Sequence, residues 1–347
     1  VPQPPLNLDV SMPELTRALL DYESVSGNEQ PIADAVHMAL SFCPHLHLTR
    51  DGDAIIARTE FPPLPGAEGE RTRVILAGHL DTVPLPTVEG SLGTVPSTVR
   101  EEEDGYVLYG RGATDMKGGV AVQLKLAAEL TAQDTDYNLT YIFYDNEEVA
   151  SELSGLARLI RNHGELITDA DFGVLLEPTN GTIEGGCNGT LRLILHVPGT
   201  AAHSARAWRG VNAIHAAATL IERVKAAPVR TVEVEGLAFR ESFSVVLIEG
   251  GTAANTIPDH CRVTVNYRLA PDRDGPAALA RARRVLAGLD PDGAEADPPI
   301  DAGTGPVEVE VDDLSPAARP GLDSPGAREL VDLVRGRGGA VGPKYGW

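Results

Sequence analysis

One sequence feature constrains the fold of this chain more than any other: polar residues recur directly after short apolar runs. The run at residues 74–77 ends at Gly78 and is followed at once by His79 and Asp81. A short apolar run that stops at a turn signal is typical of a buried parallel strand. Because open α/β sheets bind ligands outside the carboxyl ends of their strands, His79 and Asp81 are predicted to lie at a ligand site.

The same arrangement recurs further along the chain. Asp115 lies on a glycine-rich loop that leads into a predicted helix, the pair Glu147 and Glu148 follows a second predicted strand, and Glu177 follows a third. From His79 through Asp115 and Glu148 to Glu177 the gaps are 36, 33 and 29 residues, which suits one strand–helix unit per residue. We therefore predict an α/β fold with a mostly parallel sheet flanked by helices.

One histidine and several carboxylates at such positions indicate a divalent metal site, because imidazole and carboxylate both bind Zn²⁺ at about 2.0–2.2 Å. Two ions about 3.5–4 Å apart need a shared carboxylate, and Asp115 on its tight loop is the natural bridge. Neighbouring side chains on a strand point to opposite faces, so Glu147 and Glu148 reach one site only where the strand ends. Singly, these residues also fit helix capping or a solvated helix start; their joint spacing favours the metal site.

The length and the change of pattern along the chain predict two domains. A chain of 347 residues is longer than a domain with a single hydrophobic core usually is. Strands and helices alternate up to about residue 184, and the predicted order beyond it is βαββαβ, as in a ferredoxin-like sandwich. We expect a catalytic metal-binding domain from residues 1–184 and 319–347, and an inserted ferredoxin-like α+β domain from residues 185–318.

The composition restricts the partners. A formal net charge of −21 argues against nucleic acid and anionic membranes, and a negatively charged substrate needs a local basic patch. No run approaches the roughly 18 apolar residues of a membrane span. The three cysteines show no paired spacing, as in a reducing compartment. By elimination, the cytoplasm is the expected location.

With these motifs together, the chain resembles the dinuclear zinc aminoacylase/carboxypeptidase superfamily, and within it the bacterial succinyl-diaminopimelate desuccinylases. The likeness extends from about residue 12 to the end of the chain. Acetylornithine deacetylases, aminoacylases and di- and tripeptidases share its first three motifs. Six segments carry it: Gly78-His-Leu-Asp-Thr-Val-Pro84, Gly110-Arg-Gly-Ala-Thr-Asp-Met-Lys-Gly-Gly119, Asn146-Glu-Glu148, Leu176-Glu-Pro178, Ala202-His-Ser204 and Asn255-Thr-Ile-Pro258.

The resemblance implies two Zn²⁺ ions per subunit, with Co²⁺ as an alternative. His79 and Glu177 would hold one ion, Asp115 would bridge the two, and Glu148 would hold the second. Glu147 would be the general base that takes a proton from the attacking water and passes it to the departing amine.

It also implies roles outside the ligand set. Asp81 would orient the ring of His79. His203 would reach the reacting carbonyl, often in the active site of the partner subunit, and Asn255 and Arg268 would contact the substrate. The inserted domain would act as a lid and form a homodimer.

The expected reaction is hydrolysis of N-succinyl-L,L-2,6-diaminopimelate, a dicarboxylate amide, in lysine and diaminopimelate biosynthesis. Another deacylase or peptidase of the superfamily is the alternative within the same class. A non-catalytic dimeric relative is a third interpretation, although a binding protein has no need of the proton carrier Glu147.

One departure from the superfamily concerns the end of the chain. The resemblance implies that the last ligand of the second ion is a histidine near the C-terminus, whereas this chain ends at Lys344-Tyr-Gly-Trp347. We therefore expect a truncated catalytic domain that binds its second ion weakly and is nearly inactive.

Overall fold

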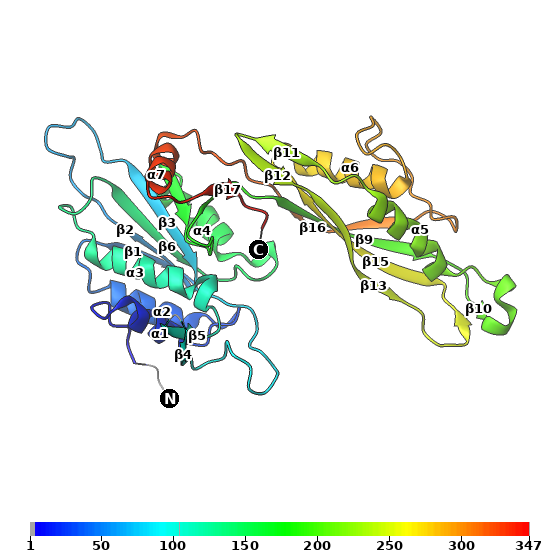
Figure 1. Ribbon diagram of the computed structural model, residues 1–347, viewed down its shortest axis with the longest axis horizontal. Coiled ribbons are helices and arrows are strands. Elements are labelled where there is room, and N and C mark those ends of the chain that lie inside the picture. Colours follow the sequence, from blue (N-terminus) through cyan, green and yellow to red (C-terminus); the bar gives the residue numbers. More distant parts are fainter. Residues whose placement is uncertain (1–3, 104, 347) are drawn as a thin grey trace. The chain divides into compact units, whose positions relative to one another are not determined.

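The computed structural model describes residues 4–103 and 105–346 (Figure 1), so Trp347 of the terminal motif lies outside the described part. The chain divides into two compact units, Val1–Gly181 and Thr182–Trp347. This boundary is close to the predicted one at residue 184. Residues 319–347 group with the second unit, and their predicted return to the first domain stays a prediction.

The first unit is built on a five-stranded sheet, and three neighbouring strands of that sheet are parallel. Strand β3 pairs in parallel with β6 and β7, and β2 pairs antiparallel with β6 and β1. The predicted α/β class is confirmed, and the parallel strands are those that precede the candidate ligands. The strand order is β1 (His47–Asp51), β2 (Ala54–Arg58), β6 (Asn138–Tyr144), β3 (Arg73–His79) and β7 (Phe172–Leu175).

Helices cover both faces of this sheet (Figure 1). Successive side chains of a strand point to opposite faces, and β6 shows this clearly. Its Tyr141 and Phe143 join the core formed with α1, α2 and α3, whereas Ile142 and Tyr144 pack towards Leu159 of α4. The helices are α1 (Met12–Leu20), α2 (Gln30–Leu40), α3 (Gly118–Glu129) and α4 (Gly155–His163), with the π-helix η1 (Ala113–Lys117), the 3₁₀ turns η2 (Ser151–Leu153) and η3 (Gly164–Leu166), and a hairpin of β4 (Thr98–Glu102) and β5 (Gly105–Tyr109).

Two glycines allow α3 and the loop before it to pack directly against the ends of the strands. A Cβ atom on Gly119 would lie 2.4 Å from the carbonyl oxygen of Leu176, the residue before Glu177. Gly112 has φ 80°, in the left-handed region that glycine adopts without strain, and a Cβ atom there would lie 2.6 Å from Thr82. These close contacts bring the Asp115 loop against the β3 and β7 ends.

The second unit has the predicted element order βαββαβ, and its two long helices pack on one face of a four-stranded antiparallel sheet (Figure 1). Along β9, alternate residues from Leu191 to Val197 are buried and contribute to the core that includes Leu220 of α5 and Leu286 of α6. The sheet order is β13 (Ser242–Gly250), β15 (His260–Leu269), β9 (Gly189–Pro198) and β16 (Glu308–Ser315), with α5 (Ala213–Ala226) after β9 and α6 (Gly275–Ala287) after β15.

The hairpin of β11 (Thr231–Val234) and β12 (Leu237–Arg240) was not expected from the sequence. Its two-residue turn places Glu235 at φ 50° and Gly236 at φ 79°, and glutamate is an unusual residue for the first of these positions. The remaining elements are β8 (Ile183–Gly185) with β17 (Val341–Pro343), β10 (Ala202–His203) with β14 (Thr256–Ile257), the 3₁₀ helix η4 (Ser204–Arg209) and α7 (Pro325–Gly336).

Two observations bear on the compositional predictions. Cys43, Cys187 and Cys261 are all free thiols, and Cys261 is buried. Among the residues that the structure describes, no helix has both the length and the apolar character needed to cross a membrane.

Candidate metal centre

The predicted ligands converge at the carboxyl ends of β3, β6 and β7 in the first unit. Ligand atoms of His79, Asp115 and Glu177 all lie within 4.8 Å of one another, and so do those of His79, Glu147 and Glu148. These residues come from four separate positions along the chain, as the strand-end pattern predicted. We call them, together with Asp81, the carboxylate cluster.

His79 is the last residue of β3, and its ring is 1% exposed. Nε2 lies 3.0 Å from Oδ1 of Asp115 and 3.9 Å from Oε1 of Glu177. Nδ1 lies 2.9 Å from the main-chain oxygen of Asp81 and 3.5 Å from its carboxylate. Burial lowers the pKa of His79, but hydrogen bonds with Asp115 and Asp81 and the charges of Glu177 and Asp81 together raise it to about 11. The site therefore strongly favours a positive charge beside Nε2.

Asp115 lies on the distorted turn η1, which is tied to its surroundings on both sides. The next residue, Met116, is buried, and its sulfur accepts the main-chain N–H of His79 at 3.2 Å. Lys117 is also buried, and its ammonium group donates to the carbonyl oxygen of Tyr22 at 2.7 Å. These contacts join the turn that carries Asp115 to the end of β3 and to the segment that follows α1.

Asp81 organises the turn that follows β6. Its Oδ1 accepts the main-chain N–H of Glu147 and its Oδ2 accepts that of Glu148, each at 3.0 Å. Burial raises the pKa of Asp81, but hydrogen bonds from His79, from these two amides and from Ser26 outweigh it, so the pKa lies below its ordinary value. The predicted contact of Asp81 with His79 is thus one part of a wider role.

The field within the carboxylate cluster is negative. Burial raises the pKa of Glu148, and the charges of Asp115, Glu147 and Asp81 raise it further, while His79 lowers it. The pKa of the buried Tyr144 hydroxyl is also raised, first by burial and then by the neighbouring carboxylates. Carboxylates placed this close together repel one another unless a cation lies among them. The donor set of imidazole and carboxylates fits a divalent ion such as Zn²⁺.

Two residues next to this cluster were not singled out from the sequence. The hydroxyl of Ser26 donates to Oδ2 of Asp81 at 2.7 Å, and Oε1 of Glu29 accepts the main-chain N–H of Asn146 at 3.2 Å. In the sequence they are merely polar residues of a turn before a helix. Only the contacts that the fold creates with Asp81 and Asn146 distinguish them.

The predicted substrate contacts lie in the second unit. His203 ends β10 and is exposed; its Nδ1 accepts the N–H of Ala205 at 3.1 Å. Asn255 is adjacent, because its carbonyl oxygen accepts the N–H of Ser204 at 2.8 Å. The guanidinium group of Arg268 donates to the hydroxyl of Thr190 at 2.6 Å.

Within this unit the structure therefore brings His203 and Asn255 together but does not place Arg268 beside them. Arg268 lies eight residues beyond the first residue of β15. An extended strand covers roughly 26 Å over that length.

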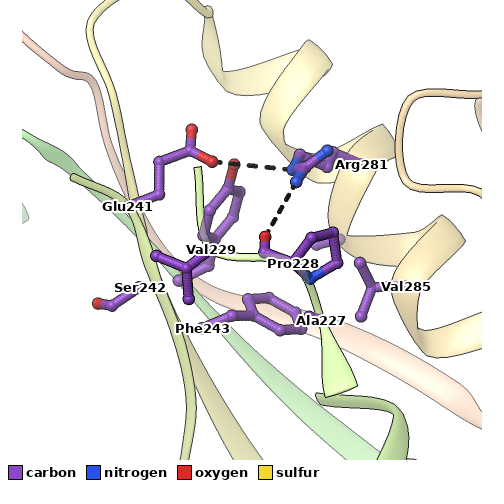
Figure 2. A pocket seen from close by; sticks show the side chains of 10 residues that line it. Ala227, Pro228, Val229, Glu241, Ser242, Phe243, Arg281 and Val285 are labelled. Carbon is purple, nitrogen blue, oxygen red and sulfur yellow. Dashed lines mark hydrogen bonds and ion pairs between the residues drawn. The ribbon is translucent and has the colours of Figure 1, made fainter. Parts of the chain in front are cut away.

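A cavity in the second unit is lined by two buried, oppositely charged residues, Glu241 and Arg281 (Figure 2). These two residues form an ion pair with each other, with 3.8 Å between Oε2 of Glu241 and Nε of Arg281. Arg230 lies at 3.8 Å from the same carboxylate, and Arg281 also pairs with Asp292 at 2.7 Å. We call these four residues the arginine cluster. Their charges are matched within the protein, so this cavity does not need an added ion.

Comparisons with known proteins show a family and named relatives. Residues 75–343 match the family model described as peptidase family M20/M25/M40. The chain is 43% identical over 335 residues to a putative succinyl-diaminopimelate desuccinylase of Mycobacterium tuberculosis, covering 96% of this chain and 84% of that protein. It is 38% identical over 336 residues to a succinyl-diaminopimelate desuccinylase of Corynebacterium glutamicum, covering 96% and 82%.

Solved structures support the fold. A tripeptidase of Staphylococcus aureus aligns with a TM-score of 0.73 at 20% identity, covering 98% of this chain and 86% of that one. A Bacillus subtilis protein described as a dinuclear metal-binding peptidase aligns with a TM-score of 0.63 at 15% identity, covering 96% and 82%.

Proposed function

Because the chain belongs to peptidase family M20/M25/M40, a family of metal-dependent hydrolases of amide bonds, we propose that it hydrolyses N-succinyl-L,L-2,6-diaminopimelate to succinate and L,L-2,6-diaminopimelate. The observation that carries the hydrolase proposal is the carboxylate cluster at the strand ends, in which two sets of three ligands share His79 and each set has its ligand atoms within 4.8 Å of one another. The choice of substrate rests on the desuccinylase names of the relatives at 43% and 38% identity.

His79, Asp115 and Glu177 would hold one divalent ion, and Glu148 would hold a second that shares Asp115. Zn²⁺ is the proposed metal, with Co²⁺ as the alternative. When bound, such ions lower the pKa of a water molecule towards about 7 and polarise the scissile carbonyl.

Glu147 would be the proton carrier of the reaction. Its side chain is exposed within the first unit, which leaves it open to water, while its main-chain N–H is tied to Asp81. It would take a proton from the attacking water as the new C–O bond forms. It would then give that proton to the amide nitrogen as the C–N bond breaks, because an amine is a far better leaving group than its anion.

Residues of the second unit would bind and polarise the substrate. His203 would donate a hydrogen bond to the developing oxyanion. Asn255 and Arg268 would contact the substrate, and the planar guanidinium group of Arg268 suits a carboxylate. A local cation is needed because the chain as a whole carries a charge of −21. Dimerisation through residues 185–318 and a cytoplasmic location are parts of the same proposal.

A substrate panel tests the proposal. We expect the chelator-treated and metal-reloaded protein to hydrolyse N-succinyl-L,L-2,6-diaminopimelate in preference to N-acetylornithine and simple dipeptides, and to lose this activity when the metal is removed. Preference for a dipeptide or an acetylated substrate would move the assignment to another deacylase or peptidase. No hydrolysis of any of these amides by the metal-loaded protein would favour the non-catalytic interpretation.

A single substitution tests the proton carrier. Glu147→Gln removes the basic carboxylate and keeps its size, so kcat should fall by about 10²–10⁴-fold while the metal content stays that of the wild type. Glu101→Gln, on the exposed β4 strand, is the matched control and should retain full activity. Equal loss in both variants, or loss of metal in Glu147→Gln, would contradict the assigned role.

A further inference from the structure

Residues 24–29 join α1 to α2 and contain none of the candidate ligands, yet they lie directly against the segment that follows β3. The hydroxyl of Ser24 donates to the carbonyl oxygen of Leu80 at 2.7 Å. The N–H of Thr82 donates to the carbonyl oxygen of Ser24 at 2.9 Å, and the N–H of Ser26 donates to the carbonyl oxygen of Thr82 at 3.2 Å. These contacts hold the main chain on both sides of Asp81.

Ser26 also holds the side chain of Asp81. Its hydroxyl donates to Oδ2 of Asp81 at 2.7 Å, and that same oxygen accepts the N–H of Glu148. The other oxygen accepts the N–H of Glu147. Asp81 is 0% exposed, so water does not replace any of these donors. The orientation of the Asp81 carboxylate therefore depends on Ser26. The position of the turn after β6, which carries Glu147 and Glu148, depends in turn on this carboxylate.

Glu29 holds the same turn at its first residue. Its side chain is 1% exposed, and its carboxylate accepts the N–H of Asn146 at 3.2 Å. The pKa of Glu29 lies above its ordinary value. Burial raises it, and hydrogen bonds from the amides of Gly27, Glu29 and Asn146 only partly oppose this. Asn146 has φ 56°, a backbone conformation that non-glycine residues adopt at a cost and keep when their surroundings enforce it.

The result is an unusual juxtaposition. Three consecutive amides, those of Asn146, Glu147 and Glu148, each donate to a buried carboxylate, the first to Glu29 and the other two to Asp81. Glu29 and Asp81 hold the main chain of this turn through these three amides. In this position, ligand atoms of Glu147, Glu148 and His79 lie within 4.8 Å of one another.

We propose that Ser26 and Glu29 are positioning residues, which hold the turn of residues 146–148 so that the proton carrier and the second metal's ligand face His79. Neither residue is among the candidate metal ligands or the proposed substrate contacts. The catalytic consequence rests on the proposed hydrolase function, whereas the ordering of the turn and the metal affinity do not. Residues of this kind typically change metal affinity or activity by 10–100-fold when they are replaced.

Two pairs of variants separate positioning from packing. Ser26→Ala and Glu29→Met remove the hydrogen-bonding group, whereas Ser26→Thr and Glu29→Gln keep a hydroxyl donor and a carbonyl acceptor at the same place. Ser11→Ala is the matched control, because Ser11 and Glu14 form a similar but exposed pair at the start of α1.

The first measurement is amide hydrogen exchange of the 347-residue chain by mass spectrometry, with and without Zn²⁺. Ser26→Ala and Glu29→Met should exchange about 10-fold faster or more in peptides that cover residues 145–149, with peptides of β6 unchanged. Ser26→Thr, Glu29→Gln and the Ser11→Ala control should match the wild type in these peptides.

The second measurement is Zn²⁺ titration together with steady-state kinetics. In Ser26→Ala and Glu29→Met the second equivalent of Zn²⁺ should bind about 10–100-fold more weakly, with the first equivalent nearly unchanged. In the active protein kcat should fall by a similar factor while KM stays within about twofold, as expected when only transition-state stabilisation is lost.

Wild-type exchange of the turn and wild-type Zn²⁺ affinity in Ser26→Ala would overturn the proposal. Faster exchange spread equally over β6 would also overturn it, because it would show a general loss of packing. Should Glu29→Met fail to fold, Ser26→Ala alone decides. If the wild type does not hydrolyse the succinylated substrate, the proposed function fails, and the exchange and Zn²⁺ measurements still test the positioning of the turn.

Discussion

The carboxylate cluster and the arginine cluster both bury charge, but they balance it differently. Around Glu241 the charges alternate, since Arg230 and Arg281 flank the carboxylate and Asp292 pairs with Arg281. Figure 2 shows the pair of Glu241 and Arg281. Around Glu148, three other carboxylates raise the pKa and a single histidine lowers it. A set whose charges are matched within the protein needs no counter-ion from outside. A buried set with a surplus of one sign needs a counter-ion from outside.

The difference has an energetic consequence. Removing one partner from a matched buried pair leaves an uncompensated charge and destabilises the protein. Removing one carboxylate from a set of like charges relieves repulsion instead. The two clusters should therefore respond to neutralising substitutions with effects of opposite sign on the metal-free protein.

The largest expected effect is on activity, in the carboxylate cluster. Glu177→Gln should lower hydrolysis roughly 10³-fold or more, because losing a metal ligand forfeits several kcal/mol of charge stabilisation. The same variant, freed of metal, should be at least as stable as the metal-free wild type in urea unfolding. A clear loss of metal-free stability would remove the distinction between the two clusters.

The next effect is on stability, in the arginine cluster. Arg281→Met keeps the length of the side chain but leaves Glu241 and Asp292 without this partner, so the free energy of unfolding of the second unit should fall by about 3–5 kcal/mol. Arg262→Met is the control, since Arg262 is 45% exposed in its pair with Glu249 and should change stability by less than about 0.5 kcal/mol. Similar losses in both would mean that burial does not set the strength of these pairs.

The smallest effect is a pH dependence at the rim of the arginine cluster. A hydrogen bond from Arg273 lowers the pKa of Asp292 below its ordinary value, burial opposes this, and the charges of Arg281 and Arg273 lower it further. A carboxyl group with a lowered folded-state pKa stabilises the protein above its unfolded-state pKa, and the contribution is lost as the pH falls through the folded-state value.

Asp292→Asn should therefore cost a few tenths of a kcal/mol at neutral pH, since Asp292 is 58% exposed and such pairs are weak. The difference from the wild type should vanish in urea unfolding as the pH is lowered from about 7 to about 2. A difference that persists in acid would show that packing, not charge, is responsible.

The sequence predicted the carboxylate cluster because its signals are local. An apolar run, a turn residue and a polar side chain such as His79 or Glu177 stand next to one another in the chain, and parallel strands bring their ends to one edge. The α/β class followed from the same pattern and is confirmed. The predicted domain division and the roles of the individual residues stay predictions and proposals.

Other features depend on contacts that no local pattern encodes. Glu241 and Arg281 look like solvent-facing charges until β13 and α6 bury them together. Ser26 and Glu29 gain their meaning from Asp81 and Asn146, which lie 55 and 117 residues away in the chain. In each case, contacts between residues far apart in the chain give ordinary polar side chains specific partners.

The contact between Gly119 and the carbonyl oxygen of Leu176 has a consequence for how the protein tolerates mutation. Even an alanine at residue 119 would force apart the start of α3 and the chain that leads to Glu177, because a Cβ atom there lies 2.4 Å from that oxygen. A saturation-mutagenesis survey should therefore rank Gly119 with the ligands themselves, although it bears no reactive group. Intolerance of substitution at Gly119 would then reflect steric crowding next to the metal ligands. It should not be interpreted as a catalytic role for this residue.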